Sequence, residues 1–212
     1  MRGKNSVGEP SRVTRTGAEF SELSEIQNKP ILTKRSPPSL ADKMLRGIWQ
    51  ITYLLFFRFS PTPFHAWRRF VLRLFGAQIG SHTSIYPSVS VWAPWNLVVG
   101  NSVTVGSGVI LYNVDLIELH DQVVVSQGTY LCTATHDYCS EIFSLMTGPI
   151  LIEKNCWVAV DAFVSPGVHI GASAVVGARS TVHRHIAPHS VVVGSPARVI
   201  GLRPVEARNF LG

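Results

Sequence analysis

His136 is the side chain best placed for chemistry, because it lies in the segment CTATHDYCSEIFSLMTGPIL, which interrupts an otherwise regular repeat. An imidazole titrates near neutral pH and can take the proton of a hydroxyl as its oxygen attacks a carbonyl, which contributes roughly 10²–10⁴ in rate. The chain has eight histidines, so the alternative is that His136 is an ordinary polar loop residue. Asp137 follows directly, and because adjacent side chains usually point apart, we expect it to shape the loop or contact a substrate.

Metal binding is a competing use of these side chains. Four histidines are candidates by residue type alone: His82, His120, His136 and His169. A catalytic zinc site needs three converging ligands, and the spacing of these histidines does not follow the expected pattern. The cysteines are Cys132, Cys139 and Cys156. Their spacing matches no zinc ribbon and their odd number argues against a disulfide framework, so we expect no metal and a reducing environment.

A strict period of six is the main signal for the fold. β-Branched aliphatic residues recur near the C-terminus at Ile152, Val158, Val164, Ile170, Val176 and Val182. Four positions after each stands a mostly small residue: Cys156, Ala162, Val168, Ala174, Ser180 or Ile186. Earlier runs follow the same rule and are separated by two-residue phase slips near residues 95–96 and 115–116. Such a repeat predicts a solenoid.

Each hexapeptide is interpreted as one short strand and a turn. Three make a triangular coil of about 18 residues, and the coils stack at the ~4.8 Å spacing of parallel strands. We expect residues 79–203 to form about six coils of a parallel β-helix, with the aliphatic residues inside and one protruding loop at residues 133–149. A β-sandwich would instead alternate with period two, so its six in-phase aliphatics would be a coincidence.

The chain before the repeat is expected to hold an arm and a helical cap. Residues 1–43 are polar and lack periodicity, which predicts a poorly ordered arm or one that orders only against a neighbour. Residues 44–78 carry two helical apolar stripes, separated by Pro61 and Pro63. The first stripe comprises Met44, Leu45, Ile48, Ile51, Leu54 and Leu55, and the second comprises Phe64, Trp67, Phe70, Val71 and Leu74.

We expect these stripes to cover the open first coil, because a solenoid with a bare end would aggregate. Arg68, Arg69 and Arg73 lie on the other side of the second stripe. The alternative is that the apolar and arginine-rich faces of residues 44–75 also contact an anionic membrane. Residues 204–212 are interpreted as a C-terminal tail.

Composition limits the partners of the chain. Apolar residues make up 46% and charged residues 15%, with a formal charge of +6. No basic stripe with interleaved aromatic residues accompanies this charge, so we expect no nucleic-acid binding. No signal peptide opens the sequence, and the apolar residues 48–59 fall short of the ~20 that span a bilayer. We expect a cytoplasmic protein, with a peripheral position at the inner face of the membrane as the alternative.

The stretch CWVAVDAFVSPGVHIGASAVVGARSTV, followed by VVVGSPARVIG, resembles the hexapeptide-repeat acyltransferases. The segments SPTPFHAWRRFVLRLFGAQIG, APWNLVVG and YLCTATHDY extend the resemblance to the colanic acid biosynthesis acetyltransferases and related sugar O-acetyltransferases, over roughly residues 45–203. This resemblance implies an all-β, left-handed parallel β-helix with an N-terminal helical cap and one protruding loop. It also implies a homotrimer, in which one subunit supplies the catalytic His and its neighbour completes the groove for coenzyme A.

The resemblance also assigns roles near the reacting atoms. His136, in TATH, matches the general base of sugar acetyltransferases. Asn113 and Trp157 match residues on the acceptor side, where Asp137 is a further candidate. The alternatives are that Asn113 is a turn residue and that Trp157 packs against the loop. The donor to the oxyanion is expected to be a backbone N–H of a neighbouring coil.

Coenzyme A is expected to bind along the coils. Ala159 and Ala178 match positions whose backbone contacts the pantetheine arm, since small side chains allow close approach. Arg184 matches a basic position for the phosphates, and GSPAR supplies Pro196 and Arg198 at the nucleotide end. The chain departs from the family at His183 and His185, which replace the usual Thr and Asp. The alternative for Arg198 is a solvated residue in a plain turn.

The function implied is O-acetyl transfer from acetyl-CoA to a hydroxyl of a sugar or lipid-linked glycan, in exopolysaccharide or glycan biosynthesis, without a metal. The fold alone does not decide this, because it also hosts other chemistries. Two alternatives remain: a metalloenzyme similar to γ-class carbonic anhydrases, and a non-catalytic β-helix scaffold.

Overall fold

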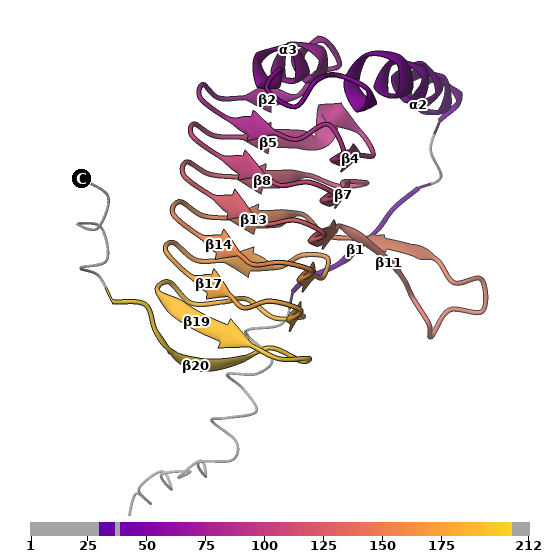
Figure 1. Cartoon of the computed structure of the whole chain (residues 1–212). Coiled ribbons are helices and arrows are strands. Elements are labelled where there is room, and N and C mark those ends of the chain that lie inside the picture. Colours follow the sequence, from indigo (N-terminus) through magenta and orange to yellow (C-terminus); the bar gives the residue numbers. More distant parts are fainter. Residues whose placement is uncertain (1–29, 37–38, 205–212) are drawn as a thin grey trace, which may run out of the picture.

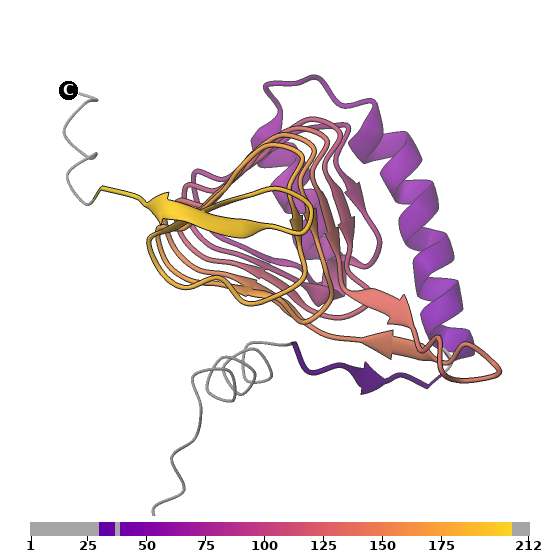
Figure 2. The same cartoon turned by 90° about the horizontal axis from the view of Figure 1, so that it is seen from below.

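Three parallel sheets form the faces of a triangular prism in the computed structural model, which describes residues 30–36 and 39–204 (Figures 1 and 2). The first face contains β2 (Gln78–Ile79), β5 (Leu97–Val99), β8 (Ile117–Leu119), β13 (Ile150–Ile152) and β16 (His169–Ile170). The second face contains β3 (Ser84–Ile85), β6 (Thr104–Val105), β9 (Val124–Val125), β14 (Trp157–Val158), β17 (Val175–Val176) and β19 (Ser190–Val193). The third face contains β4 (Ser90–Val91), β7 (Ile110–Tyr112), β10 (Tyr130–Cys132), β15 (Phe163–Val164) and β18 (Thr181–Val182).

The prism interior confirms the period of six. On the third face, one aliphatic residue per coil stacks in register, and each is 2% exposed or less: Val91, Leu111, Leu131, Val164 and Val182. The small residues of the repeat, such as Cys156 and Ala162, are buried beside them. Five coils are complete and β19 begins a sixth, close to the predicted number. The predicted parallel β-helix is confirmed and the sandwich interpretation is wrong.

The irregular residues of the repeat all lie at the corner between the third and first faces. The phase slip near residues 95–96 is a 3-10 turn, η2 (Pro94–Asn96). The second slip lies at the same corner in the next coil, and Asn96 Nδ2 donates to the carbonyls of Asn113 (3.2 Å) and Val114 (2.8 Å). In the third coil this corner opens into an antiparallel hairpin of β11 (Ala134–His136) and β12 (Leu145–Thr147), which protrudes as predicted (Figure 1).

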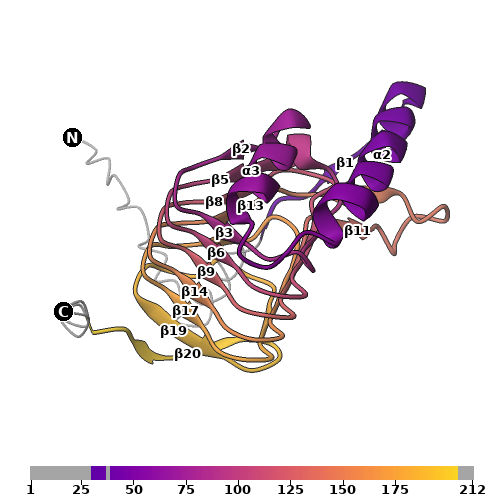
Figure 3. The same ribbon diagram turned by 45° about the horizontal axis from the view of Figure 1, so that its top comes forward.

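Helices cover the N-terminal end of the prism (Figure 3). α2 (Leu40–Thr52) continues into a π-helical turn, η1 (Tyr53–Arg58), and α3 (His65–Leu74) follows the proline break. Ser39 and Asp42 form a reciprocal capping box at the start of α2. Gly76 has a φ of 90° just after α3, where a left-handed residue ends the helix.

The apolar stripes of the cap do not face the prism, which contradicts the prediction. All six residues of the first stripe are exposed, as are Phe64, Trp67, Phe70 and Leu74 of the second. The cap instead packs inward through Trp49, Phe57, Val71 and Leu72, which are at most 3% exposed.

The open edge of the first coil explains this inversion, because its carbonyls need hydrogen-bond donors. The side chains of Arg73, Arg69, Arg68 and Trp49 donate to the carbonyls of Ile79, Thr83, Ile85 and Val91 at 3.0, 2.7, 2.5 and 2.8 Å, respectively. A buried carbonyl without a donor costs roughly 1–3 kcal/mol. The arginines therefore face the prism, and the apolar stripe on the other side of α3 is turned outward. At the opposite end, β20 (Arg198–Leu202) closes the prism by pairing antiparallel with β19.

Part of the arm predicted to be poorly ordered is structured. β1 (Thr33–Lys34) pairs antiparallel with β12, and the Arg35 N–H donates to the carbonyl of Leu145 at 3.0 Å. α2 also begins inside the predicted arm. Residues 30–36 therefore order against the hairpin of their own chain. The remaining arm, residues 1–29 and 37–38, and the tail from residue 205 lie outside the described residues.

Candidate active site

The hairpin carries His136 away from the prism corner. His136 is the last residue of β11 and pairs in register with Leu145 of β12. The hairpin is closed where the Asp137 N–H donates to the Ser144 carbonyl at 2.9 Å. Asp137 Oδ1 also accepts the N–H of Cys139 at 3.0 Å, which holds the turn. Asp137 thus shapes the loop, the first of the two roles expected for it.

A backbone carbonyl orients the His136 ring. His136 Nδ1 lies 2.6 Å from the carbonyl oxygen of Phe143, a residue with a φ of 45°. Because a carbonyl can only accept, Nδ1 carries the proton, and in the neutral ring Nε2 keeps its lone pair. The residue is exposed, so Nε2 is available to a substrate. Sequence reasoning missed this contact, since no motif marks the carbonyl of a residue seven positions further on.

An aromatic stripe follows the third face on both sides of the hairpin. Its ring centroids lie 5.1 Å apart for Trp92–Tyr112, 6.4 Å for Tyr112–Tyr130, 5.5 Å for Tyr130–Phe163 and 6.5 Å for Phe163–His183. Burial raises the pKa of Tyr130 to about 12, so its hydroxyl stays protonated. The hairpin leaves the prism at the end of β10, which begins with Tyr130, in the middle of this stripe. The sequence signal was available, because each member lies within one residue of an inward-pointing aliphatic.

A pocket of about 120 Å³ lies at the cap end of the stripe. Its walls include Arg35, Arg46, Trp92, Tyr112 and Leu145, the cross-strand partner of His136. The Arg46 guanidinium lies 5.1 Å from the centre of the Trp92 ring. Its Nε is buried and has no hydrogen-bond partner among the described residues. The pocket thus offers an aromatic wall and unused hydrogen-bonding capacity close to the hairpin, and sequence reasoning missed it.

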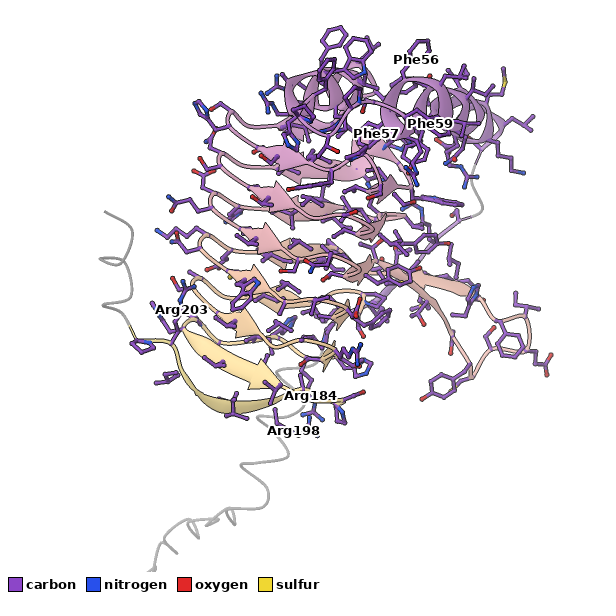
Figure 4. The ribbon with its side chains drawn as sticks, in the orientation of Figure 1. Phe56, Phe57, Phe59, Arg184, Arg198 and Arg203 are labelled. Carbon is purple, nitrogen blue, oxygen red and sulfur yellow. The ribbon has the colours of Figure 1, made fainter. Side chains whose placement is uncertain are left out.

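A second pocket, of about 240 Å³, lies at the other end of the stripe. It brings together three residues predicted to hold coenzyme A: Arg184, Pro196 and Arg198. Figure 4 shows the two arginines near each other at the C-terminal end of the prism. His183, a member of the aromatic stripe, also lines it, and its Nδ1 lies 2.6 Å from Ser165 Oγ. Two arginines at one opening suit anionic phosphates.

The side chain of Asn113 is engaged within the chain, which favours the turn interpretation over a contact with the acceptor. Its side chain is 0% exposed. Oδ1 accepts the N–H groups of Trp92 and Ala93 at 3.0 and 3.1 Å. Nδ2 donates to the carbonyls of Ala93 and Asn96 at 2.5 and 3.1 Å. Asn113 therefore links the irregular turns of two successive coils through hydrogen bonds, in agreement with the turn interpretation.

The backbone groups of Ala159 form hydrogen bonds within the chain. Its N–H donates to the Val176 carbonyl at 2.9 Å, and its carbonyl accepts the Thr129 hydroxyl at 2.9 Å. Both backbone groups are thus paired within the chain, and the residue is only 6% exposed. Ala178, by contrast, is exposed in the turn after β17.

Trp157 lies apart from His136 within one chain. It belongs to β14 on the second face, whereas the hairpin leaves the corner between the other two faces. Its ring is 48% exposed and Nε1 donates to Ser126 Oγ at 2.9 Å. A shared site with His136 would therefore need a second subunit.

The histidines considered as metal ligands serve separate contacts. His120 Nε2 lies 2.9 Å from Glu118, and His169 Nε2 lies 2.8 Å from Glu153, both on the first face. The hydrogen bond from His169 holds the pKa of Glu153 below its usual value. His82 lies in the turn after β2, with a φ of 54°. Within residues 30–36 and 39–204, no group of three His, Cys, Asp or Glu side chains could hold a metal ion.

Comparisons with known proteins agree with this fold. No family model matches the chain. The chain is 44% identical over 153 residues to the putative colanic acid biosynthesis acetyltransferase WcaF of Escherichia coli (strain K12), covering 72% of the chain and 84% of that relative. A maltose O-acetyltransferase of Clostridium difficile 630 matches at 26% identity and a TM-score of 0.66, covering 77% of this chain and 90% of that one.

A hexapeptide-repeat acetyltransferase of Vibrio cholerae, solved in complex with acetyl-CoA, has the same fold. The TM-score is 0.73 at 23% identity, and the match covers 80% of this chain and 92% of that one. At this identity the likeness concerns the fold. The fold of this chain thus has a counterpart of known architecture.

Proposed function

The chain belongs to the hexapeptide-repeat acetyltransferases, and we propose that it moves an acetyl group from acetyl-CoA to a sugar hydroxyl with His136 as general base. The contact between His136 Nδ1 and the Phe143 carbonyl carries this proposal. It favours the tautomer in which Nε2 can accept a proton. The hairpin that carries His136 lies between the aromatic pocket of Trp92 and Tyr112 and the arginine-lined pocket of Arg184 and Arg198. The names of the colanic acid and maltose relatives support transfer to a sugar oxygen.

The proposed reaction is one direct attack. The sugar oxygen attacks the thioester carbonyl while His136 Nε2 takes the hydroxyl proton, and a tetrahedral intermediate forms. Its oxyanion is stabilised by a backbone N–H of a neighbouring coil. The intermediate then expels the thiolate of coenzyme A, which receives the proton from the imidazolium. The products are the acetylated sugar and free coenzyme A, and the ring returns to its neutral form.

We assign the two pockets to the two substrates. Arg184, Pro196 and Arg198 would hold the phosphates and nucleotide of acetyl-CoA, with Ala178 beside the pantetheine arm. The Vibrio structure, solved with acetyl-CoA, supports this co-substrate. The acceptor would lie in the pocket of Trp92, Tyr112, Arg46 and Leu145. Aromatic rings can stack on the apolar faces of a sugar, and the guanidinium of Arg46, which lines the pocket, can donate to its oxygens.

We further propose a homotrimer with active sites between subunits. In that assembly Trp157 of one subunit would approach the His136 hairpin of another, which a single chain does not allow. The acceptor would be a sugar or lipid-linked glycan, and a lipid-linked acceptor would place the enzyme at the cytoplasmic face of a membrane. Light scattering should give the trimer mass, whereas a monomer at working concentration would contradict this assembly.

An acceptor panel tests the proposed function. The purified chain is incubated with acetyl-CoA and a series of mono- and oligosaccharides, and release of free coenzyme A is measured together with acetylated product. We expect release that depends on the sugar and that continues after chelation of metals. Carbon dioxide hydration that requires zinc would instead support the metalloenzyme. An inactive chain that binds neither acetyl-CoA nor sugars would support the scaffold.

A further inference from the structure

The outer face of the cap is an extended apolar surface. Its side chains are 40–77% exposed and come from α2, η1 and α3: Leu40, Met44, Ile48, Leu55, Phe56, Phe59, Phe64, Trp67, Phe70 and Leu74. We call this set the apolar cap face. Phe56 points away from the prism, whereas the adjacent Phe57 points toward it (Figure 4). Four of these side chains, Phe56, Phe59, Phe64 and Trp67, line one groove, and an exposed apolar patch marks an interaction site.

The outward direction of this face follows from how the cap is held. Arg68 is 0% exposed and donates to the carbonyl of Ile85, to Ser60 Oγ and to the carbonyl of Pro61. Rotating α3 to bury its apolar side would withdraw Arg68 and Arg73 from the carbonyls of the first coil. The prism therefore cannot take up the apolar cap face.

Polar groups within the apolar cap face are satisfied internally. Trp67 Nε1 donates to the Phe56 carbonyl at 2.8 Å. The hydroxyl of Thr52 donates to the carbonyl of Ile48 at 3.0 Å, and that of Ser60 donates to the carbonyl of Phe57 at 2.6 Å. In hydrocarbon an unpaired donor costs several kcal/mol, so internal pairing suits this surface to an apolar medium that offers no acceptors.

The charges of the cap favour an anionic surface. Residues 40–76 contain six Lys and Arg but a single acidic residue, Asp42. Asp42 is engaged with Ser39 at the start of α2. Lys43 and Arg58 are exposed, whereas Arg73, although also exposed, donates to the Ile79 carbonyl of the first coil. Basic side chains beside an apolar surface are typical of helices that lie in the interface of an anionic membrane.

We propose that the apolar cap face docks on an anionic lipid bilayer, with the cap helices lying flat in the interface. The helices lie across the end of the prism (Figures 1 and 3), so docking would place the prism axis along the membrane normal. An open groove of about 530 Å³ between η1 and α3, walled by Phe56, Phe59, Phe64 and Trp67, could take a lipid chain. In the described part of the chain, no helix is long and apolar enough to span the bilayer. This inference does not depend on the acetyl-transfer reaction.

Vesicle sedimentation of the full chain tests the docking. Vesicles of phosphatidylcholine alone are compared with vesicles that also contain phosphatidylglycerol. We expect at least ~10-fold stronger partition onto the anionic vesicles, weakened by salt. Phe56→Ser with Phe70→Ser should lower that partition at least ~10-fold, because two aromatic side chains that would insert into the bilayer are lost. Lys43→Gln with Arg58→Gln should reduce the preference for anionic vesicles.

A matched control uses equally exposed apolar residues at the other end of the prism. Val199 and Ile200 of β20 are 62% and 65% exposed, and Val199→Ser with Ile200→Ser should leave partition unchanged. Circular dichroism should show every variant folded. Equal binding by wild type and the Phe56/Phe70 variant would overturn the proposal. The proposal would also be overturned if light scattering gave that variant a different mass while its vesicle binding stayed the same. The apolar cap face would then be a contact between copies of the chain.

Discussion

The prism and its cap use amphipathic segments in opposite ways. In the prism the aliphatic member of each hexapeptide points inward, as Val158 and Val176 do at 0% exposure. In the cap most aliphatic and aromatic residues point outward, and α3 turns an arginine, Arg68, into the interior. Both regions nevertheless show regular apolar periodicity in the sequence.

The difference lies in the backbone that each region must satisfy. Inside the prism each coil pairs with the next, so side chains need only fill space. The first coil has no coil before it, and its carbonyls must find donors elsewhere. The carbonyls of Ile79 and Ile85 find them in arginine side chains. Hydrogen bonding at a sheet end can thus decide which side of a helix faces the core.

Removing the buried arginine should have the largest effect on stability. Arg68→Ala leaves the carbonyls of Ile85 and Pro61 without this donor, and we expect a loss of about 4 kcal/mol or more in the free energy of unfolding. Urea denaturation followed by circular dichroism measures it. Arg58→Ala, at an exposed arginine of the same cap, should change stability by less than ~0.5 kcal/mol. Equal effects of the two substitutions would refute the idea that arginines hold the cap.

Two leucines of α3 test the orientation of the helix directly. Leu72 is 0% exposed and Leu74 is 70% exposed. Leu72→Ala should cost about 3 kcal/mol of unfolding free energy, because it opens a cavity. Leu74→Ala should cost less than ~0.5 kcal/mol. The same denaturation experiment compares them, and a larger cost at Leu74 would show that α3 faces the prism with its other side.

The prism corner offers a smaller effect. Asn113→Ala removes an acceptor and a donor from the corner where the two phase slips stack. The N–H of Ala93 loses its acceptor, whereas the N–H of Trp92 keeps the Leu111 carbonyl. We expect a loss of about 2 kcal/mol. Acetyl-CoA binding, measured by calorimetry, should be unchanged, because the residue has no surface exposed to a ligand. If the variant kept normal stability but bound the acceptor more weakly, Asn113 would contact the acceptor despite its burial.

The outer surface of the prism should contribute least. Glu153→Gln removes the negative charge beside His169, and we expect this partly exposed pair to contribute under ~1 kcal/mol. The pKa of Glu153 is lowered in the folded state, so this contribution is present above the unfolded value of about 4.3 and is lost as the pH falls through the folded value. Thermal unfolding of both proteins should differ at pH 6 and converge in acid. A difference that grows in acid would contradict the assignment.

Much of the prism could be predicted because every coil requires the same pattern of residues. Every coil needs an aliphatic residue inside and a small one near the corner, so the period of six revealed the fold and its break revealed the hairpin. The orientation of the cap could not be predicted. A helical stripe identifies two faces of α3, but the choice between them depended on carbonyls of the first coil, such as that of Thr83.

The site was predictable to a similar degree. His136 stood out because it interrupts a repeat, and the GSPAR motif placed Pro196 and Arg198 beside Arg184. The pocket beside the hairpin was not predictable, since its walls come from the arm, α2, two coils and the hairpin. The contact of His136 with the Phe143 carbonyl depends on the backbone of a turn, which residue types do not encode.

The most direct test is the acetyl-transfer rate of His136→Ala, measured beside its affinity for acetyl-CoA. We expect the rate to fall by at least ~10², with acetyl-CoA affinity and unfolding free energy nearly unchanged, because His136 lies on a hairpin outside the stacked core. Near-normal turnover in the variant, or a loss that follows only the loss of folded protein, would contradict the role of His136 as the base.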